Sequence, residues 1–389
     1  MTEMAHGTVV VQSGEAILPR WWRTVDRVTI GCVLALFAIG ILLGFAASPP
    51  LALRNDSAPF YYVTRQAFFG AAALAVMLIT SMLSPVLVRR LSTLGFALAL
   101  LALTLLPFFG TDYGTGGMRW FSLGFASLQP SEFLKPVFVI VVAWLMAANL
   151  ELAGPPGKFI SFILTLFIVA LLAIQPDFGQ SALILFAWSV IYFVAGAPIV
   201  IVVAVGGAIL GAGILAYNGS EHFASRIDGF LTAELDPYSQ LARAENAIRE
   251  GGVFGAGVGE GAVIWALPDA HTDFIVAVAA EEYGLVMVLI LIGLFALIAM
   301  RAFFRLMRER DPFIRLAGTG LASLLALQSI INLGVAVRLL PAKGMTLPFV
   351  SYGGSSLVAM GILVGMLLCL TRLRPQGEIG DYLISRGRG

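Results

Sequence analysis

Charged residues are scarce in this chain. Asp, Glu, Lys and Arg together make up 12% of its 389 residues, whereas soluble domains carry about 25%. This shortage excludes an ordinary soluble domain, and hydrophobic residues instead make up 59% of the chain. The net charge is +1 and no basic patch is interleaved with aromatic residues, so nothing indicates a nucleic-acid partner. The composition predicts an all-α polytopic membrane protein.

Cysteine and histidine are also rare, which removes two further classes of protein. The two cysteines, Cys32 and Cys369, fall in apolar runs near opposite ends of the chain, so we expect buried thiols and no disulfide framework. The histidines lie far apart in sequence and form no metal-ligand cluster: His6, His222 and His271. The sequence predicts no metal site or other cofactor, and it leaves open whether a divalent cation accompanies an anionic ligand.

Long apolar runs are plentiful. A bilayer core of about 30 Å needs roughly 20 apolar residues per helix, and about ten runs approach or exceed that length. The fifth and sixth are short enough to be tilted or partly re-entrant. An even number of crossings puts both termini on one side. The runs are 28–47, 64–85, 91–109, 132–150, 158–174, 180–195, 198–217, 273–300, 313–339 and 354–371.

The distribution of Arg and Lys indicates on which side of the membrane the termini lie, because cytoplasmic loops carry the excess of these residues. With ten helices, the arginine-rich segments fall on one face, which we predict to be cytoplasmic together with both termini. The basic residues are Arg20, Arg23, Arg27, Arg89, Arg90, Lys158, Arg301, Arg305, Arg308, Arg310, Arg315, Arg372 and Arg374. The predicted organisation is a cytoplasmic tail (1–27), a membrane domain (28–372) with an extracytoplasmic loop at about 218–272 between helices 7 and 8, and a second cytoplasmic tail (373–389).

The opposite, outer face receives the unusual segments 111–131, 175–180, 218–272 and 341–356. Within the long loop, the apolar spacing of 240–250 predicts a short helix lying on the membrane surface. A run of alternate glycines follows it: Gly255, Gly257, Gly259 and Gly261. The run lacks the preceding strand and the acidic residue of a dinucleotide site, so we interpret it as a flexible outer loop.

Asp273 is the most informative residue, because it lies one turn inside a predicted membrane helix. An ionisable group there is costly without a partner or a water-filled cavity. It can act as a general base if a substrate hydroxyl reaches it. The alternative is a helix N-cap. His271 precedes it and is more readily explained by structure than by catalysis, and the carboxylates Glu281 and Glu282 follow two turns later.

Two cations accompany this carboxylate on the outer face. Arg119 lies in the glycine-rich segment GTGGMRW, and Lys135 lies one turn into an apolar helix that Ser131 caps. Glu132 and Lys135 are three residues apart, so they share a helix face and can pair. Arg and Lys together suggest a phosphate-bearing ligand, for which an anionic lipid is the natural source. The alternative is anchoring to lipid headgroups, with Lys135 snorkelling to the surface.

Two further segments of the outer face, one around Asp177 and one at 341–356, are expected to border the same site. Asp177, between Pro176 and Gly179, either caps the following helix or lines a cavity. The segment 341–356, PAKGMTLPFVSYGGSS, contains Lys343 and Ser351 and mixes Gly, Pro and small polar residues at membrane depth. Irregular backbone is tolerated there only where it is buried in protein or lines a cavity, so it is predicted to form a cavity wall.

These segments resemble the SEDS family (shape, elongation, division and sporulation), in the family's order and over roughly 28–372. The matching stretches are Gly117–Trp120 with Gln129–Lys135, Gln175–Gly179, Gly251–Gly255, Leu267–Phe274 and Pro341–Ser356. The form of the last stretch is more similar to the division branch than to the elongation branch. The sequence GEGAVIWALPDA departs somewhat from the family's usual form, although not at Asp273.

The resemblance implies a peptidoglycan glycosyltransferase that polymerises lipid II, a disaccharide-pentapeptide on undecaprenyl pyrophosphate, at the outer face of the plasma (inner) membrane and at the division septum. It places the family's catalytic aspartate on Asp273 and its essential basic positions on Arg119 and Lys135. Glu132 would orient Lys135, and His271, Asp177, Lys343 and Ser351 would support the site. We further expect a lysine near Asp273 to keep it ionised.

The resemblance also implies partners. These are a class B penicillin-binding protein of the FtsI type, other division-complex membrane proteins and membrane lipid. Three other functions remain to be weighed: a lipid II flippase, an elongation-type polymerase and a division scaffold. A flippase should carry polar features near the midplane or inner face, whereas here they gather at the outer face.

Overall fold

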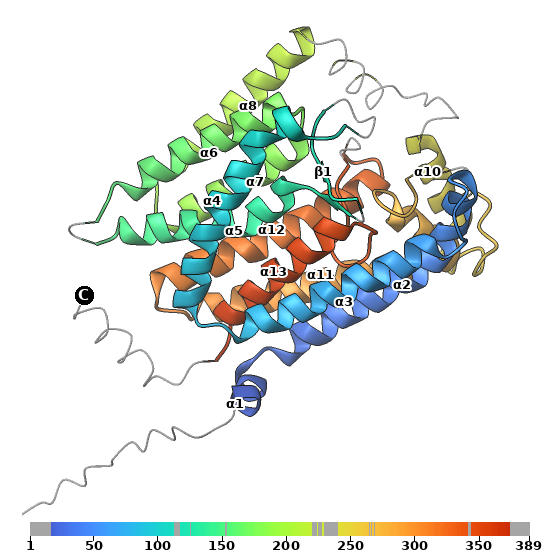
Figure 1. The fold of residues 1–389 in the computed structure, drawn as a ribbon, viewed down its shortest axis with the longest axis horizontal. Coiled ribbons are helices and arrows are strands. Elements are labelled where there is room, and N and C mark those ends of the chain that lie inside the picture. The colour runs from blue at the N-terminus through green and yellow to red at the C-terminus, as the bar shows by residue number, and fades with distance from the viewer. Residues whose placement is uncertain are drawn as a thin grey trace, which may run out of the picture.

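The computed structural model describes residues 17–112, 117–124, 126–151, 154–219, 224, 228, 240–263, 265, 267, 269–340 and 344–373. Helices dominate, and a two-stranded antiparallel ribbon, β1 (Phe121–Ser122) with β2 (Ser127–Leu128), precedes α5 (Figure 1). The helices are α1 (Ile17–Thr24), α2 (Arg27–Arg54), α3 (Tyr61–Met82), α4 (Pro85–Phe109), α5 (Pro130–Ala148), α6 (Gly157–Ile174), α7 (Phe178–Val194), α8 (Ile199–Gly219), α10 (Gln240–Gly251), α11 (Ile275–Leu306), α12 (Pro312–Ala336) and α13 (Gly354–Leu370).

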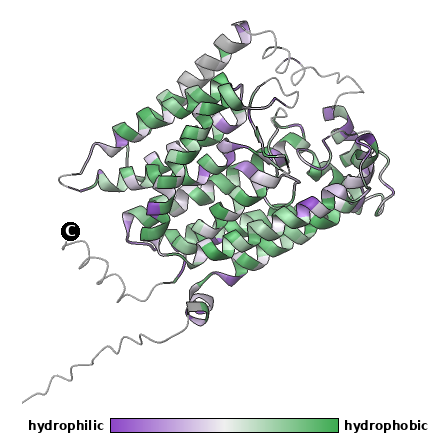
Figure 2. Cartoon of the chain, in the orientation of Figure 1, coloured by the Kyte–Doolittle hydropathy of each residue, from purple (hydrophilic) through white to green (hydrophobic). Residues whose placement is uncertain are grey.

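Ten of these helices, α2–α8 and α11–α13, correspond to the ten predicted runs, so the protein is a multi-pass membrane protein. Seven are long and apolar enough to cross a membrane, and α7 and α13 are shorter apolar helices. Hydrophobic residues predominate along the helices (Figure 2), and many of their large apolar side chains are exposed. The Leu373 N–H donates to the Thr24 carbonyl at 3.0 Å, which places the start of α2 and the end of α13 at the same end of the bundle.

Three predicted helix limits were wrong by six or seven residues, and one of them is the end of α11, which lies at Leu306 and not at 300. The first helix continues to Arg54 through Pro49 and Pro50. The third begins at Pro85 rather than 91, because Ser84 caps it by accepting from the Leu87 N–H at 3.3 Å. Arg89 and Arg90, which were predicted to lie in the loop before this helix, therefore lie on the helix itself.

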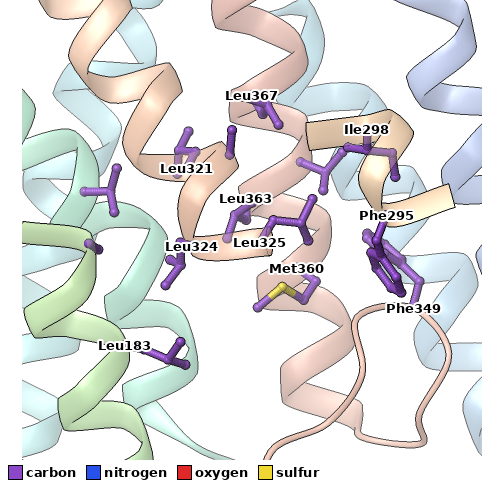
Figure 3. Close-up of a cluster of buried hydrophobic side chains, with 14 of the residues drawn as sticks. Leu183, Phe295, Ile298, Leu321, Leu324, Leu325, Phe349, Met360, Leu363 and Leu367 are labelled. Atoms are coloured by element: carbon purple, nitrogen blue, oxygen red, sulfur yellow. The ribbon is translucent and has the colours of Figure 1, made fainter. Parts of the chain in front are cut away.

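The core lies between α5, α12 and α13, whose residues are mostly buried. Large apolar side chains from α12, α13 and α11 meet there with a loop residue, Phe349 (Figure 3). In the peripheral helices α3, α4 and α6, only 28% of the most apolar window is buried. The buried helices therefore form a rigid frame, and this frame carries the polar residues described below.

The helix α11 is interrupted at Gly284, where φ is 74° and ψ is −172°. The segment 251–259 packs against this interruption, and its backbone bonds to the carbonyls that the break leaves free. For example, the Ala256 N–H donates to the Glu281 carbonyl at 2.7 Å. A β-carbon on Gly284 would collide with backbone of this segment, so the close approach requires glycine. The glycine run is a loop, as predicted, and its first residues are hydrogen-bonded to α11.

The carboxylate pair holds the same segment. Glu282 accepts from the Gly259 N–H at 2.6 Å, and Glu281 accepts from the Val263 N–H at 2.8 Å. Both side chains are buried. We conclude that these carboxylates fasten the outer loop to α11.

The helix predicted at 240–250 exists as α10, but its environment differs from the prediction. Its small residues Ala244 and Ala247 are fully buried, and α10 packs on α11. The apolar face of α10 therefore packs against α11.

At the opposite end, the end that the charge bias assigns to the cytoplasm, a buried carboxylate joins two helices. Asp26 caps α2 and accepts two hydrogen bonds from the Arg301 guanidinium, each 3.0 Å, and Arg305 lies 3.5 Å away. Burial alone would raise the pKa of Asp26, but the two arginines outweigh it and lower that pKa below its ordinary value. Arg305 also donates to the Thr371 carbonyl at 3.1 Å, which adds the end of α13.

Replacing Arg301 by alanine should lower the free energy of unfolding by about 2–4 kcal/mol, because it leaves the Asp26 carboxylate buried with a single, longer ion pair. Thermal unfolding in detergent measures this. The matched control is Arg308→Ala, since Arg308 is exposed and exposed charges contribute little. Equal stability of the two variants would contradict the role given to the Asp26 cluster.

Candidate active site

Two amide side chains on α12 organise the outer polar cluster. Gln328 and Asn332 are four residues apart, so they lie on one helix face, one turn from each other. Both are almost fully buried, with 1% of each residue exposed. Gln328 reaches toward Lys135, and Asn332 reaches toward Asp273. Helix α12 thereby connects the Lys135 side chain and the turn that carries Asp273.

Lys135 is wholly buried, as 0% of the residue is exposed. Its ammonium forms an ion pair with Glu132 at 2.9 Å and donates to the Gln328 side-chain oxygen at 3.0 Å. Glu132 also accepts from the Gln180 amide at 2.6 Å. The pairing of Lys135 with Glu132 is confirmed. The alternative in which Lys135 snorkels to the membrane surface is wrong, because the side chain points into the protein.

Asp177 combines the two roles that the sequence left open. Its carboxylate caps α7 by accepting from the Gln180 N–H at 3.4 Å, and it also accepts from the Gln129 amide at 3.4 Å. It is buried, with 6% of the residue exposed. Burial raises the pKa of Asp177, and the nearby Arg119 guanidinium opposes this only in part. Asp177 therefore belongs to the same buried polar cluster as Glu132 and Lys135.

Arg119 lies beside this cluster and holds its loop. The guanidinium donates to the Gln175 carbonyl at 3.2 Å and to the Pro176 carbonyl at 2.7 Å. These bonds tie the glycine-rich outer segment to the turn before Asp177. Two of its five donors are thus engaged with the protein itself, and binding of an anion by Arg119 stays a prediction.

Asp273 lies just before α11, in a turn, and not inside the helix. The N-cap of α11 is Phe274, and no side chain caps the helix there, so the N-cap interpretation of Asp273 was wrong. The Asn332 amide donates to the Asp273 carbonyl at 3.2 Å. The carboxylate faces a crevice lined by Asp273, Ile331, Asn332, Val335, Gly344 and Met345. Asp273 therefore lines a narrow crevice and does not cap α11.

The pKa of Asp273 is raised from its ordinary 3.8 to about 7. Burial is the main cause, repulsion from Asp269 adds to it, and a hydrogen bond from the Gly344 backbone opposes it. Lys135 is not among the groups that set this pKa, and Lys343 lies outside the described residues, so a lysine that keeps Asp273 ionised stays a prediction. A base with a pKa near the working pH is well suited to proton transfer.

The segment 344–353 forms the wall behind Asp273, as its composition predicted. The Ser351 hydroxyl donates to the Thr272 carbonyl at 2.6 Å and accepts from the Leu347 N–H at 2.8 Å. The Tyr352 N–H donates to the His271 carbonyl at 2.9 Å. Ser351 therefore positions the turn that carries Asp273. Lys343, also expected to support the site, lies outside the described residues.

His271 packs as an aromatic ring between Tyr62 and Tyr352, with centroid distances of 5.3 and 5.5 Å. Burial lowers its pKa to about 4, although Asp269 opposes this, so the ring is neutral at pH 7. The structural interpretation of His271 fits these contacts. Among the residues that the structure describes, no cluster of three or more His, Cys, Asp or Glu could hold a metal ion.

Sequence reasoning missed Gln328 and Asn332. A usable signal existed, since two amide residues four apart interrupt the apolar run 313–339 and share one helix face. Each carries a bond that joins distant segments: Gln328 also donates to the Thr346 carbonyl at 3.1 Å, and Asn332 to the Met345 carbonyl at 2.6 Å. They are the connection between α5, α12 and the loop before α13.

Comparison with known proteins identifies the family. The family model described as "Cell cycle protein" (FTSW_RODA_SPOVE) matches residues 26–375. The chain belongs to the SEDS family of FtsW and RodA. A relative from Caulobacter vibrioides, named "Probable peptidoglycan glycosyltransferase FtsW", is 43% identical over 369 residues, covering 94% of each chain. A relative of the same name from Haemophilus influenzae is 32% identical, covering 92% of each.

Solved SEDS structures share the fold. One chain, from a structure described as "Structural coordination of polymerization and crosslinking by a peptidoglycan synthase complex", superposes with a TM-score of 0.73 at 29% identity, covering 89% of this chain and 97% of that one. The rod-shape-determining protein RodA of Thermus thermophilus superposes with a TM-score of 0.65 at 27% identity, covering 91% and 99%. The all-α polytopic fold is therefore that of the SEDS family.

Proposed function

We propose that this protein is a peptidoglycan glycosyltransferase that polymerises lipid II at the outer face of the plasma membrane. The observation that carries the proposal is that two amides one turn apart on α12 bond to the buried Lys135 ammonium and to the backbone of Asp273. Asp273 is held there through Asn332, and Lys135 through Gln328. Joining two sugars with loss of a pyrophosphate needs these two groups, and the relatives named as glycosyltransferases support the assignment.

In the proposed reaction, the Asp273 carboxylate takes the proton of the 4-hydroxyl of the acceptor's N-acetylglucosamine. The hydroxyl oxygen attacks the anomeric carbon of the donor's N-acetylmuramic acid, and the bond to undecaprenyl pyrophosphate breaks. Direct displacement converts an α-linked donor into a β-linked glycan. Lys135 stabilises the charge that grows on the leaving group, which is electrostatic catalysis. Arg119, Asp177 and Glu132 keep the Lys135 cluster in place.

A lipid substrate also needs an apolar path, and one borders the site. A groove of about 610 Å³ opens between α3, α4, α5 and α13 and is lined almost wholly by apolar side chains, among them Leu98, Phe133, Val137, Ile362 and Met366. Helix α5 forms one side of this groove and carries Lys135 on another face. We place the polyprenyl chain of lipid II in this groove, with its pyrophosphate toward Lys135.

The cellular setting follows from the same proposal. We assign residues 1–27 and 373–389 to the cytoplasm and the loop at about 218–272 to the outer side. The division role, at the septum, rests on the relatives named FtsW. A class B penicillin-binding protein is the partner we propose, by analogy with the peptidoglycan synthase complex whose chain shares this fold. Other division-complex proteins would regulate the pair.

The polymerisation rate should rise with pH along a single limb centred near pH 7. The pKa of Asp273 is about 7, and only the ionised carboxylate can accept the proton. Because this pKa is raised on folding, the same group contributes less to stability as pH rises from about 4 through 7. Initial rates between pH 5 and 9, at saturating lipid II, measure the limb. A limb centred near the ordinary pKa of Asp would contradict the burial argument.

The test of the function is glycan synthesis from purified lipid II in liposomes, with the cognate class B partner present and its cross-linking blocked. We expect β-linked glycan strands and released undecaprenyl pyrophosphate. Lipid II that crosses the bilayer without forming polymer would instead indicate a flippase.

A further inference from the structure

The side-chain oxygen of Asn332 is buried and unpaired. It has no hydrogen-bond partner among the residues that the structure describes. Only 1% of the residue is exposed, so solvent does not satisfy this oxygen either. The amide nitrogen donates to two carbonyls, those of Asp273 at 3.2 Å and Met345 at 2.6 Å. Because both of these partners only accept, the nitrogen must face them and the oxygen must face away. The orientation of the amide is therefore fixed by its surroundings.

An unpaired buried amide oxygen is costly, at about 1–3 kcal/mol, and calls for an explanation. Asn332 lines the same narrow crevice as Asp273, Gly344 and Met345. Gly344 has φ of 66°, and a β-carbon there would come within 3.7 Å of the Asp273 carboxylate oxygen. The positive φ favours glycine at this position, and the contact distance shows that Gly344 lies directly beside the Asp273 carboxylate. A ligand group in this crevice would meet the Asp273 carboxylate and the Asn332 oxygen together.

We infer that the Asn332 amide oxygen binds the acceptor sugar, by accepting a hydrogen bond from the hydroxyl adjacent to the one that Asp273 deprotonates. This inference rests on the proposed function and adds a substrate contact to it. A sugar ring offers neighbouring hydroxyl donors, and a neutral acceptor can bind one without competing for the proton that the carboxylate takes. Asn332 thereby fixes the ring so that the attacked hydroxyl faces Asp273.

The inference differs from a purely structural role, in which Asn332 acts only by holding the backbone of Asp273. Loss of that hold would move the base and lower the turnover rate without weakening substrate binding. Loss of a substrate contact would weaken lipid II binding and leave the pKa of the base unchanged. Two substitutions separate these cases: Asn332→Ala removes the oxygen, and Asn332→Asp keeps an acceptor oxygen.

The experiment measures lipid II binding in detergent on an Asp273→Asn background, where no turnover occurs, and pH–rate profiles on the wild-type background. We expect Asn332→Ala to weaken lipid II binding roughly five- to tenfold, with the limb still near pH 7. We expect Asn332→Asp to retain binding within about twofold and to move the limb to higher pH, since a second carboxylate disfavours ionisation of Asp273.

Unchanged lipid II binding in Asn332→Ala, with a lower turnover rate, would overturn the inference and leave the proposed function standing. Loss of binding in a folded Asn332→Asp would also overturn it. A wild-type protein that binds lipid II but makes no polymer with its partner would overturn the proposed function, while the binding comparison still decides the role of Asn332. Thermal unfolding of each variant establishes that it is folded.

Discussion

Replacement of Asp273 by asparagine should lower the rate of lipid II polymerisation by about 10²–10⁴-fold, the usual contribution of a general base. Asparagine has nearly the same shape and keeps the turn before α11, but it cannot accept the proton of the attacking hydroxyl. The hold on this turn does not depend on the carboxylate, since Asn332 and Ser351 bond to the carbonyls of Asp273 and Thr272. Folding should therefore be retained.

The matched control is Glu260→Gln, which removes an exposed carboxylate from the same outer end and should leave the rate unchanged. Glycan yield by gel electrophoresis, at equal folding and equal partner binding, gives the comparison. A polymerisation rate within tenfold of wild type in Asp273→Asn would show that the base lies elsewhere.

Replacement of Lys135 by methionine should remove both activity and stability. Methionine fills a similar volume, but it leaves Glu132 buried and without its cation. Removing one partner of a buried ion pair costs about 3–5 kcal/mol. Activity should fall by about 10²–10³-fold, because the leaving pyrophosphate loses its charge stabilisation. Unfolding midpoints and polymerisation rates report the two effects.

A second variant separates the two effects. In the double variant Glu132→Gln, Lys135→Met the uncompensated carboxylate is gone, and the free energy of unfolding should recover most of the loss. Activity should stay low, since no cation returns. Recovery of activity along with stability would mean that Lys135 serves only the packing of α5.

The helices were predictable because each membrane crossing needs its own apolar run, and each of the ten runs corresponds to a helix in the structure, although three limits differ by six or seven residues. The pairing of Lys135 with Glu132 was equally predictable, because a three-residue spacing fixes a shared face. The sequence also predicted that Asp177 could cap a helix and that Ser351 lies in the segment beside Asp273. Local rules were sufficient for these features.

Features that depend on contacts between distant segments could not be predicted from the sequence. The break in α11 at Gly284 exists because 251–259 supplies its hydrogen bonds, and no local pattern specifies that partner. The same holds for Asn332, whose importance comes from its contacts with Asp273 and Met345. The raised pKa of Asp273 depends on burial and on Asp269, both products of tertiary packing.

The most direct test of the central claim, that Asp273 is the base of lipid II polymerisation, compares pH–rate profiles of the wild type and Asp269→Asn. Asp269 raises the pKa of Asp273 by repulsion, so neutralising it should move the limb from about pH 7 toward lower pH and leave the plateau rate nearly unchanged. Asparagine can still interact with the Gln240 amide that bonds to Asp269 at 3.0 Å. A limb that stays at the wild-type pH in a folded Asp269→Asn protein would contradict the assignment of the base to Asp273.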